Sequence, residues 1–266
     1  GEHKFQRPRR ARRMLSARCV SVLYGNRDGY TCYWKLHFEE ARSMTTTAFM
    51  PLFSDRVLAN LKAPGASNDS NLVVEGDTIR CDETGETFPV INGIPSLFTP
   101  SPGEGIEVTE RVRSFYEENP FPSYEGLEEF GELVSKGHAN PFSKSLLDAI
   151  GYNKTILECG CGTGQLSHYL QLNNNAVLGI DMSLASLGLA IQHKQRNDLK
   201  RVSFAQMNIF NLAIKENSFD VVISHGVLHH TFDARRAFGQ IVSMLKPGGI
   251  VLVGLYNRPA RLPTLI

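Results

Sequence analysis

The sequence predicts an α/β protein with a doubly wound, mostly parallel sheet and a small N-terminal β module. From residue 155 onward, short apolar runs alternate with helical patterns, which is typical of strand–helix units. Runs such as "DVVIS" and "GIVLVGLY" are apolar without alternation, so we expect helices on both faces of the sheet. Between residues 50 and 100, apolar positions instead alternate over short stretches, which indicates short strands.

The β module is expected over residues 51–100, with turns at Gly76-Asp77, Thr84-Gly85 and Asn92-Gly93. Residues 101–154 are expected to form a linker and a helical, aromatic segment. After a Pro/Gly stretch over 98–107, a helical period includes Val108 and breaks at Asn119-Pro120, where a Pro- and aromatic-rich loop follows. A helix over 140–151 should then end at Gly151.

The main domain is expected over residues 155–266. Its pattern predicts strands over 155–160, 176–181, 202–207, 219–224 and 249–256. Helices are expected from about 165, over about 184–196 and over about 234–245. Right-handed crossovers would bring the loops after these strands to one edge of the sheet, where ligands of such folds bind.

The first 50 residues are rich in arginine and are expected to be a disordered or non-native extension. Two alternatives stay open for this extension, an RNA-binding arm and an organelle-targeting segment. Met44 and Met50 would be plausible alternative starts.

Composition excludes several broad classes. Lys and Arg together number 28 against 27 Asp and Glu, so no overall charge favours nucleic acid, a membrane surface or acidic partners. Five cysteines are an odd count in a long chain, so we expect no disulfide framework and a reducing, cytoplasmic location. No segment reaches the roughly 18–20 apolar residues that a membrane span needs.

The stretch "TILECGCGTGQLSHYL", residues 155–170, places a glycine-rich turn between the first strand and the next helix. Such a turn lets a ligand approach the backbone closely. A dinucleotide-binding turn would have the spacing Gly-x-Gly-x-x-Gly, whereas Gly160, Gly162 and Gly164 alternate here. Cys159 and Cys161 lack the neighbouring ligands that a metal site needs, so we interpret them as packing residues and expect no metal.

With Glu158 before its glycines, this turn resembles the first motif of the class I S-adenosylmethionine-dependent methyltransferases. Asp181 at the end of the second strand, "AQMNIF", "FDVVISHGVLHHTFD" and "MLKPGGIVLVGLYN" match later family motifs in order. The resemblance implies a Rossmann-like fold and S-adenosyl-L-methionine as cofactor. The implied cofactor-binding residues are Glu158, Gly160, Cys161, Gly162, Thr163, Gly164, Gln165, Asp181, Met182, Asn208, Ile209 and His225.

The resemblance also assigns finer roles. Asp181 would accept the ribose hydroxyls, while Met207 and Ile209 would enclose the adenine. Asn208 departs from the family pattern, because the family usually has Asp there to hold the adenine amino group.

Catalytic and acceptor-binding residues are less strongly indicated. His229 and His230 follow the fourth predicted strand, where a neutral histidine could act as a general base, although both could instead scaffold the loop. Tyr116, Phe121 and Tyr124 could form a lid over cofactor and substrate, or dock the linker onto the sheet.

Residues 79–98 resemble the Trm112-like, zinc-ribbon-like module that precedes some methyltransferases. "FPVINGIPSL" is intact, but Thr84 stands where the second cysteine of the metal-binding pair would be. We therefore expect a metal-free β module whose core is Phe88, Val90, Ile94 and Leu97.

The family sheet normally has seven strands, and the sequence stops shortly after the fifth, so we expect a truncated domain. The predicted activity is methyl transfer to an unidentified acceptor. A small metabolite, lipid or sugar-like molecule is the first choice, and tRNA or a protein is the second. The alternative is a non-catalytic remnant that binds cofactor or a partner. The oligomeric state is not predicted.

Overall fold

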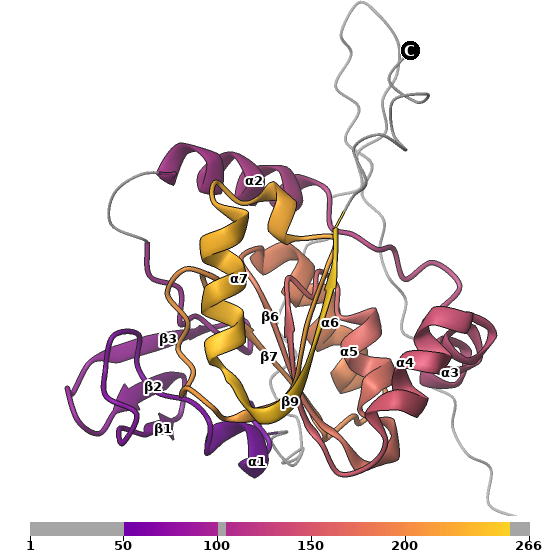
Figure 1. The fold of residues 1–266 in the computed structure, drawn as a ribbon, viewed down its shortest axis with the longest axis horizontal. Coiled ribbons are helices and arrows are strands. Elements are labelled where there is room, and N and C mark those ends of the chain that lie inside the picture. The colour runs from indigo at the N-terminus through magenta and orange to yellow at the C-terminus, as the bar shows by residue number, and fades with distance from the viewer. Residues whose placement is uncertain (1–50, 101–104, 256–266) are drawn as a thin grey trace, which may run out of the picture. The chain divides into compact units, whose positions relative to one another are not determined.

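The computed structural model describes residues 51–100 and 105–255 (Figure 1). The chain divides into two compact units, Gly1–Ala48 and Phe49–Ile266, and the second is described below. The predicted N-terminal extension lies outside the described residues, as does the segment after residue 255.

The N-terminal module is a short helix followed by a four-stranded antiparallel meander in the order β1-β2-β3-β4. Asn92 and Gly93 both have positive φ, +51° and +79°, as a tight hairpin turn requires, and the predicted turn at Asn92-Gly93 is confirmed. The helix, α1, was not predicted. The elements are α1 (Asp55–Leu58), β1 (Leu72–Glu75), β2 (Thr78–Cys81), β3 (Thr87–Ile91) and β4 (Ile94–Pro95).

Three helices connect the module to the sheet: α2 (Ile106–Glu118), α3 (Phe130–Ala139) and α4 (Pro141–Ile150). The predicted break at Asn119-Pro120 and the predicted helix over 140–151 are confirmed. Asn140 caps α4, because its side-chain oxygen accepts hydrogen bonds from two backbone N–H groups of the first turn. Helix α3 was not predicted; it begins with a capping box between Glu129 and Glu132.

The main sheet has five parallel strands in the order β7-β6-β5-β8-β9, which confirms the predicted doubly wound fold. Every residue of β5 and β7 is buried, and most of β8, which contains "DVVIS", is buried too. For "GIVLVGLY" the expectation of cover on both faces was wrong, because no residue of the last strand is fully buried and Ile250 is 51% exposed. The last strand begins earlier than predicted, at Leu245. The elements are β5 (Thr155–Cys159), α5 (Gln165–Leu170), β6 (Ala176–Asp181), α6 (Leu184–Arg196), β7 (Val202–Gln206), β8 (Phe219–His225), α7 (Ala234–Ser243) and β9 (Leu245–Gly254).

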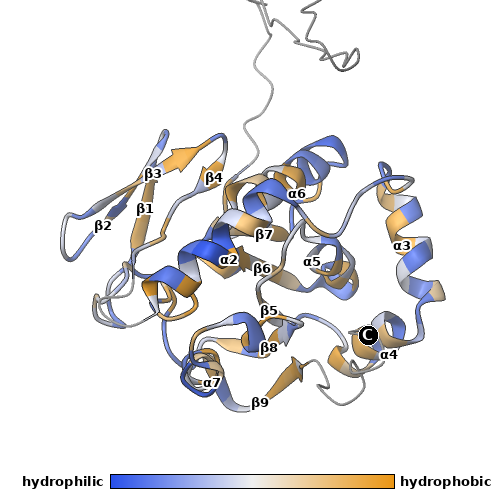
Figure 2. Ribbon diagram, turned by 90° about the horizontal axis from the view of Figure 1, so that it is seen from above, coloured by the Kyte–Doolittle hydropathy of each residue, from blue (hydrophilic) through white to orange (hydrophobic). Residues whose placement is uncertain are grey.

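The module adjoins one edge of this sheet (Figures 1 and 2). Ser96 pairs with Gln206 of the edge strand β7, and the Leu97 backbone N–H donates to the Gln206 carbonyl at 3.0 Å. Phe88 and Leu97 are buried in one hydrophobic cluster with Leu157 of the central strand. The module core is therefore continuous with the core of the main sheet, and β7 is a covered edge.

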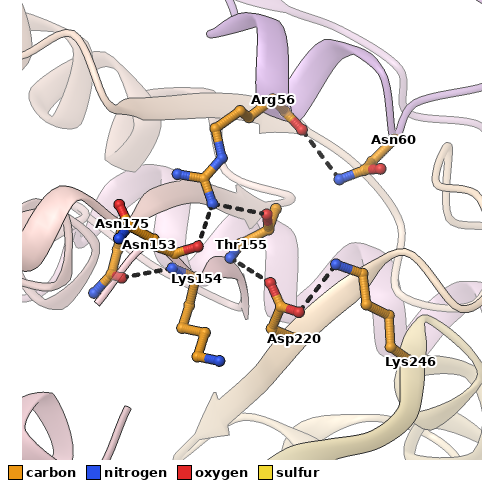
Figure 3. Close-up of polar contacts among 8 residues, drawn as sticks. All are labelled: Arg56, Asn60, Asn153, Lys154, Thr155, Asn175, Asp220 and Lys246. Carbon is orange, nitrogen blue, oxygen red and sulfur yellow. Dashed lines mark hydrogen bonds and ion pairs between the residues drawn. The ribbon is translucent and has the colours of Figure 1, made fainter. Parts of the chain in front are cut away.

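A polar network fastens α1 to the amino ends of the strands, opposite the edge where ligands bind (Figure 3). In Figure 3 the Arg56 guanidinium donates to the Asn153 carbonyl at 2.6 Å. It also donates to the Asn174 carbonyl at 3.0 Å. Nearby, Asp220 accepts a hydrogen bond from the Thr155 backbone N–H at 2.8 Å and forms an ion pair with Lys246. These contacts join module and sheet into one structural unit.

Candidate active site

A cavity of about 460 Å³ opens at the carboxyl ends of β5, β6, β7 and β8, where ligands bind in doubly wound folds. Its volume lies in the range of small-molecule sites. One side, here called the sheet wall, is formed by Glu158, Gly160, Cys161, Gly162, Gln165, Asp181, Met182, Met207, Asn208 and Ile209. The other side, here called the helix wall, comprises Leu133, Lys136, Gly137, Asn140, Phe142, Ser143, Leu166 and Tyr169.

The glycine turn lies at the centre of the sheet wall, and its backbone has no room for side chains. Gly162 has φ +54°, and a Cβ built there would lie 2.3 Å from the Phe121 carbonyl oxygen. A Cβ at Gly160 would lie 2.3 Å from a Val227 methyl carbon. Only glycine satisfies both the conformation and the close approach.

Two carboxyl groups, the buried Glu158 and the half-buried Asp181, face the cavity beside this turn. The Asp181 carboxylate accepts hydrogen bonds from the backbone N–H groups of Gly162 and Ser183, both at 2.9 Å. Burial raises the pKa of Asp181, although these hydrogen bonds oppose the rise. Burial also raises the pKa of Glu158 to about 7, against the lowering effect of a hydrogen bond from the Ser167 hydroxyl.

The end of β7 completes the sheet wall with Met207, Asn208 and Ile209, which all line the cavity. The Asn208 amide donates to the Thr99 carbonyl at 3.2 Å, and its side-chain oxygen accepts from the Phe210 backbone N–H at 3.0 Å. Thr99 lies at the C-terminal end of the module, after β4, so the module reaches the cavity wall.

A second path joins the module to the same wall. The Ser96 hydroxyl donates to the Gln206 side-chain oxygen at 2.7 Å. The Gln206 amide in turn donates to the Met182 carbonyl at 2.9 Å.

The segment over residues 119–127 is fastened to the glycine turn. The Thr163 backbone N–H donates to the Phe121 carbonyl at 3.2 Å, and its hydroxyl donates to the Pro122 carbonyl at 2.7 Å. The Gln165 amide donates to the Ser123 carbonyl at 2.6 Å. The Tyr124 hydroxyl donates to the Thr163 carbonyl at 2.7 Å, so the segment and the turn support each other.

The three predicted lid residues differ in whether they line the cavity. Tyr116 and Phe121 line the cavity, whereas Tyr124 does not. The Tyr124 ring is instead stacked on His193 at a centroid distance of 4.6 Å, and burial raises the pKa of its hydroxyl above the ordinary range. Of the two roles that the sequence left open for Tyr124, a lid or docking of the linker, its position in the structure fits docking.

Glu117 was not predicted from the sequence, although it positions the sheet wall. Its two carboxylate oxygens accept hydrogen bonds from the backbone N–H groups of Leu184 and Ala185, both at 2.8 Å, at the start of α6. An anion at a helix N-terminus is stabilising, and this helix begins directly after Asp181-Met182. The signal could not be found in sequence because the two partners lie more than 60 residues apart.

The three histidines at the end of β8 and after it also differ in whether they line the cavity. His225 and His230 line the cavity, whereas His229 does not. The His225 ring lies 5.2 Å from that of Phe142, so it stands between the sheet wall and the helix wall. The rings of His229 and His230 lie 4.1 Å apart.

The other predicted cofactor-binding residues also divide by position. Glu158, Gly160, Cys161, Gly162, Gln165, Asp181, Met182, Asn208 and Ile209 line the cavity. Thr163 and Gly164 are buried behind the turn, where Gly164 packs against Phe204. Sequence reasoning named no residue of the helix wall. Leu133 and Lys136 face the cavity from α3, which was not predicted, so their shared face could not be recognised.

Neither turn cysteine has features of a reactive thiol. Cys159 and Cys161 are buried, and burial raises the pKa of both thiols. Within residues 51–100 and 105–255, no three His, Cys, Asp or Glu side chains are grouped to hold a metal ion. Across the same ranges no helix is long and apolar enough to cross a bilayer. The cytoplasmic location stays a prediction.

Comparison with known proteins agrees with this geometry. Residues 150–266 match the family model described as a methyltransferase domain. An uncharacterized protein of Synechococcus sp. is 32% identical over 165 residues, 58% of this chain and 38% of its own length. A ubiquinone biosynthesis O-methyltransferase of Acinetobacter baumannii is 30% identical over 106 residues, 40% of this chain and 45% of that enzyme. The chain thus spans less than half the length of these curated relatives.

Among solved structures, the PH0226 protein of Pyrococcus horikoshii aligns with a TM-score of 0.48 and 21% identity, over 57% of this chain and 70% of that chain. The family match agrees with the methyltransferase domain that the sequence predicts from residue 155 onward. No comparison tests the resemblance of residues 79–98 to the Trm112-like module, so it stays a prediction.

Proposed function

We propose that this chain binds S-adenosylmethionine against the sheet wall and transfers its methyl group to a small-molecule acceptor. The observation that carries the proposal is the convergence of the glycine turn and Asp181 on one cavity, within the segment that matches a methyltransferase domain. Backbone groups at Gly160 and Gly162 would allow close approach, and Asp181 would accept the ribose hydroxyls. Met207 and Ile209 would enclose the adenine.

When bound, S-adenosylmethionine would supply an electrophilic methyl group: the acceptor nucleophile would bond to the methyl carbon as the carbon–sulfur bond breaks, with its electron pair kept by the sulfur of the departing S-adenosylhomocysteine. The chain's own contribution would be alignment and exclusion of water. Of the two predicted bases, His230 is the better candidate to accept the acceptor's proton, because it lines the cavity and His229 does not.

A small acceptor is favoured over tRNA or a protein, because the site is a cavity of about 460 Å³ with a largely apolar helix wall. The name of the Acinetobacter baumannii relative, a ubiquinone biosynthesis O-methyltransferase, also fits a small acceptor.

A second candidate is cofactor binding without catalysis. It is favoured by Asn208, whose side chain already bonds to Thr99 and Phe210 within the protein. In that case the cavity would bind the cofactor as a structural or regulatory ligand.

Calorimetric titration of the full chain with S-adenosylmethionine and S-adenosylhomocysteine tests both candidates. We expect both ligands to bind, and a Gly162→Arg variant to bind neither. Failure of both ligands to bind would refute the proposal, and unchanged binding by the variant would refute the placement. Binding without methyl transfer to metabolite or tRNA pools would favour the second candidate.

A further inference from the structure

The helix wall is apolar over most of its surface. Leu133 and Tyr169 are buried, Leu166 is half-buried, and Phe142 extends the same surface towards His225. No acidic residue belongs to this wall, whereas Glu158 and Asp181 both belong to the sheet wall. The two walls therefore suit different chemical groups.

Lys136 is the one Lys or Arg that lines the cavity within the described residues. It lies in the last turn of α3 and forms no ion pair with any described residue. An ammonium group at the mouth of an apolar surface attracts an anion more strongly than the same group in open solvent.

Tyr169 supplies a second donor on the same wall. It is only 2% exposed, and its hydroxyl has no hydrogen-bond partner within the described residues. A buried hydroxyl without a partner is unfavourable, so a ligand oxygen that accepts from it would be stabilised.

The position of Tyr169 relative to Lys136 is set by Gly137. A Cβ at Gly137 would lie 2.4 Å from a Tyr169 ring carbon, so the ring rests on the backbone of α3 one residue from Lys136. Lys136 and the Tyr169 ring thus lie on the same part of the helix wall. The Tyr169 hydroxyl also lies within electrostatic range of Lys144 and Asp148 on α4.

We propose that the methyl acceptor is an anionic amphiphile. Its carboxylate or phosphate is held by Lys136 and Tyr169, and its apolar body lies against Leu133, Leu166 and Phe142. This inference rests on the proposed function, since it assigns the helix wall to the acceptor. A single basic residue is too few for binding to the phosphate backbone of RNA.

The test is calorimetric titration of the full chain with four probes of equal chain length: octanoate, octyl phosphate, octanol and octyltrimethylammonium. Titrations are made with and without saturating S-adenosylhomocysteine. We expect at least one anionic probe to bind about tenfold or more tightly than octanol, and the cation to bind weakest. The stronger of the two anions identifies the headgroup as carboxylate or phosphate. Equal binding of anion and alcohol, or binding of no probe, would overturn the inference.

Single substitutions test the contributions of the Lys136 charge and the Tyr169 hydroxyl to anion binding. Lys136→Met keeps the apolar stem and should reduce anion binding to the level of octanol, and Tyr169→Phe should weaken it several-fold. Lys200→Met is the matched control, because Lys200 is exposed and lies outside this cavity. Retained anion preference in Lys136→Met, or an equal loss in Lys200→Met, would contradict the assignment.

The two proposals can fail separately. If S-adenosylhomocysteine does not bind, the proposed function fails, while the anion preference is still measured on the ligand-free protein. If S-adenosylhomocysteine binds and the anion preference is absent, the assignment of the helix wall fails alone.

Discussion

The two walls of the cavity are held in place by different means. The sheet wall is hydrogen-bonded to distant segments: Thr99, Glu117 and the loop over 119–127 all accept hydrogen bonds from it or from the helix that follows it. Side chains of residues 131–150 in the helix wall bond, among the described residues, only within α3 and α4. The difference indicates that the fold fixes the sheet wall tightly, while the helix wall can vary with less effect on the rest of the structure.

The largest expected effect is at the glycine turn. Gly162→Ala adds a Cβ where the Phe121 carbonyl oxygen lies 2.3 Å away, so turn and segment cannot both keep their positions. We expect S-adenosylhomocysteine binding to weaken about a hundredfold or more. Gly126→Ala is the control, because Gly126 also has positive φ, +70°, with nothing within 4 Å of its Cβ. Equal losses in the two variants, measured by calorimetry, would show that backbone strain alone is responsible.

A second prediction concerns the buried carboxyl group of Glu158. Its pKa is raised to about 7 in the folded protein, above its unfolded value, so its contribution to stability is complete at low pH and is lost as pH rises through 7. Glu158→Gln cannot ionise and should lose less stability on going from pH 5 to pH 8, by about 2 kcal/mol.

Urea unfolding of both proteins without ligand at each pH measures this difference. The same pH slope in wild type and variant would show that Glu158 is ionised throughout the range. Asp181 is present in both proteins, so its own titration affects both curves.

A third prediction tests the link between module and cavity. Asn208→Asp removes the N–H that donates to the Thr99 carbonyl and places a carboxylate against that oxygen. We expect S-adenosylhomocysteine binding to weaken about tenfold. If the residue acted only on the adenine amino group, the acid would instead strengthen binding.

Asn211→Asp is the matched control for this link. The Asn211 amide donates to the Thr99 hydroxyl, which can reverse its role and donate to an acid. Binding should therefore change little in this variant. An equal loss at both positions would mean that added negative charge, and not the lost donor, weakens binding.

The smallest expected effect is at the cap of α6. Glu117→Gln keeps one acceptor oxygen but loses the charge that faces the Leu184 and Ala185 N–H groups. We expect the free energy of unfolding to fall by about 1 kcal/mol. Glu118→Gln, exposed on the same helix, should change it by less than about 0.5 kcal/mol. Urea denaturation measures both values, and equal changes would contradict a capping role.

The same contrast explains what the sequence could predict. The strands and the glycine turn of the sheet wall are encoded locally, by apolar runs and by glycines at fixed spacing, so they could be recognised. Helix α3 was missed because Gly131 and Gly137 lower its helix propensity, and Gly137 is explained only by the Tyr169 ring that rests on it.

Long-range pairing accounts for the rest. The bonds from Thr99 to Asn208 and from Glu117 to α6 join residues far apart in sequence, and no local pattern signals them. The separation of His230 from His229, and of Phe121 from Tyr124, depends likewise on tertiary packing.

The most direct test of the assignment of the sheet wall to the cofactor and the helix wall to the acceptor is to titrate S-adenosylhomocysteine into two variants, one from each wall. Asp181→Asn alters the sheet wall, where the carboxylate holds the N–H groups of Gly162 and Ser183, and should weaken binding about tenfold or more. Lys136→Met alters the helix wall and should leave binding within about twofold of wild type. Equal losses in the two variants, or a loss in Lys136→Met alone, would contradict the assignment of the sheet wall to the cofactor.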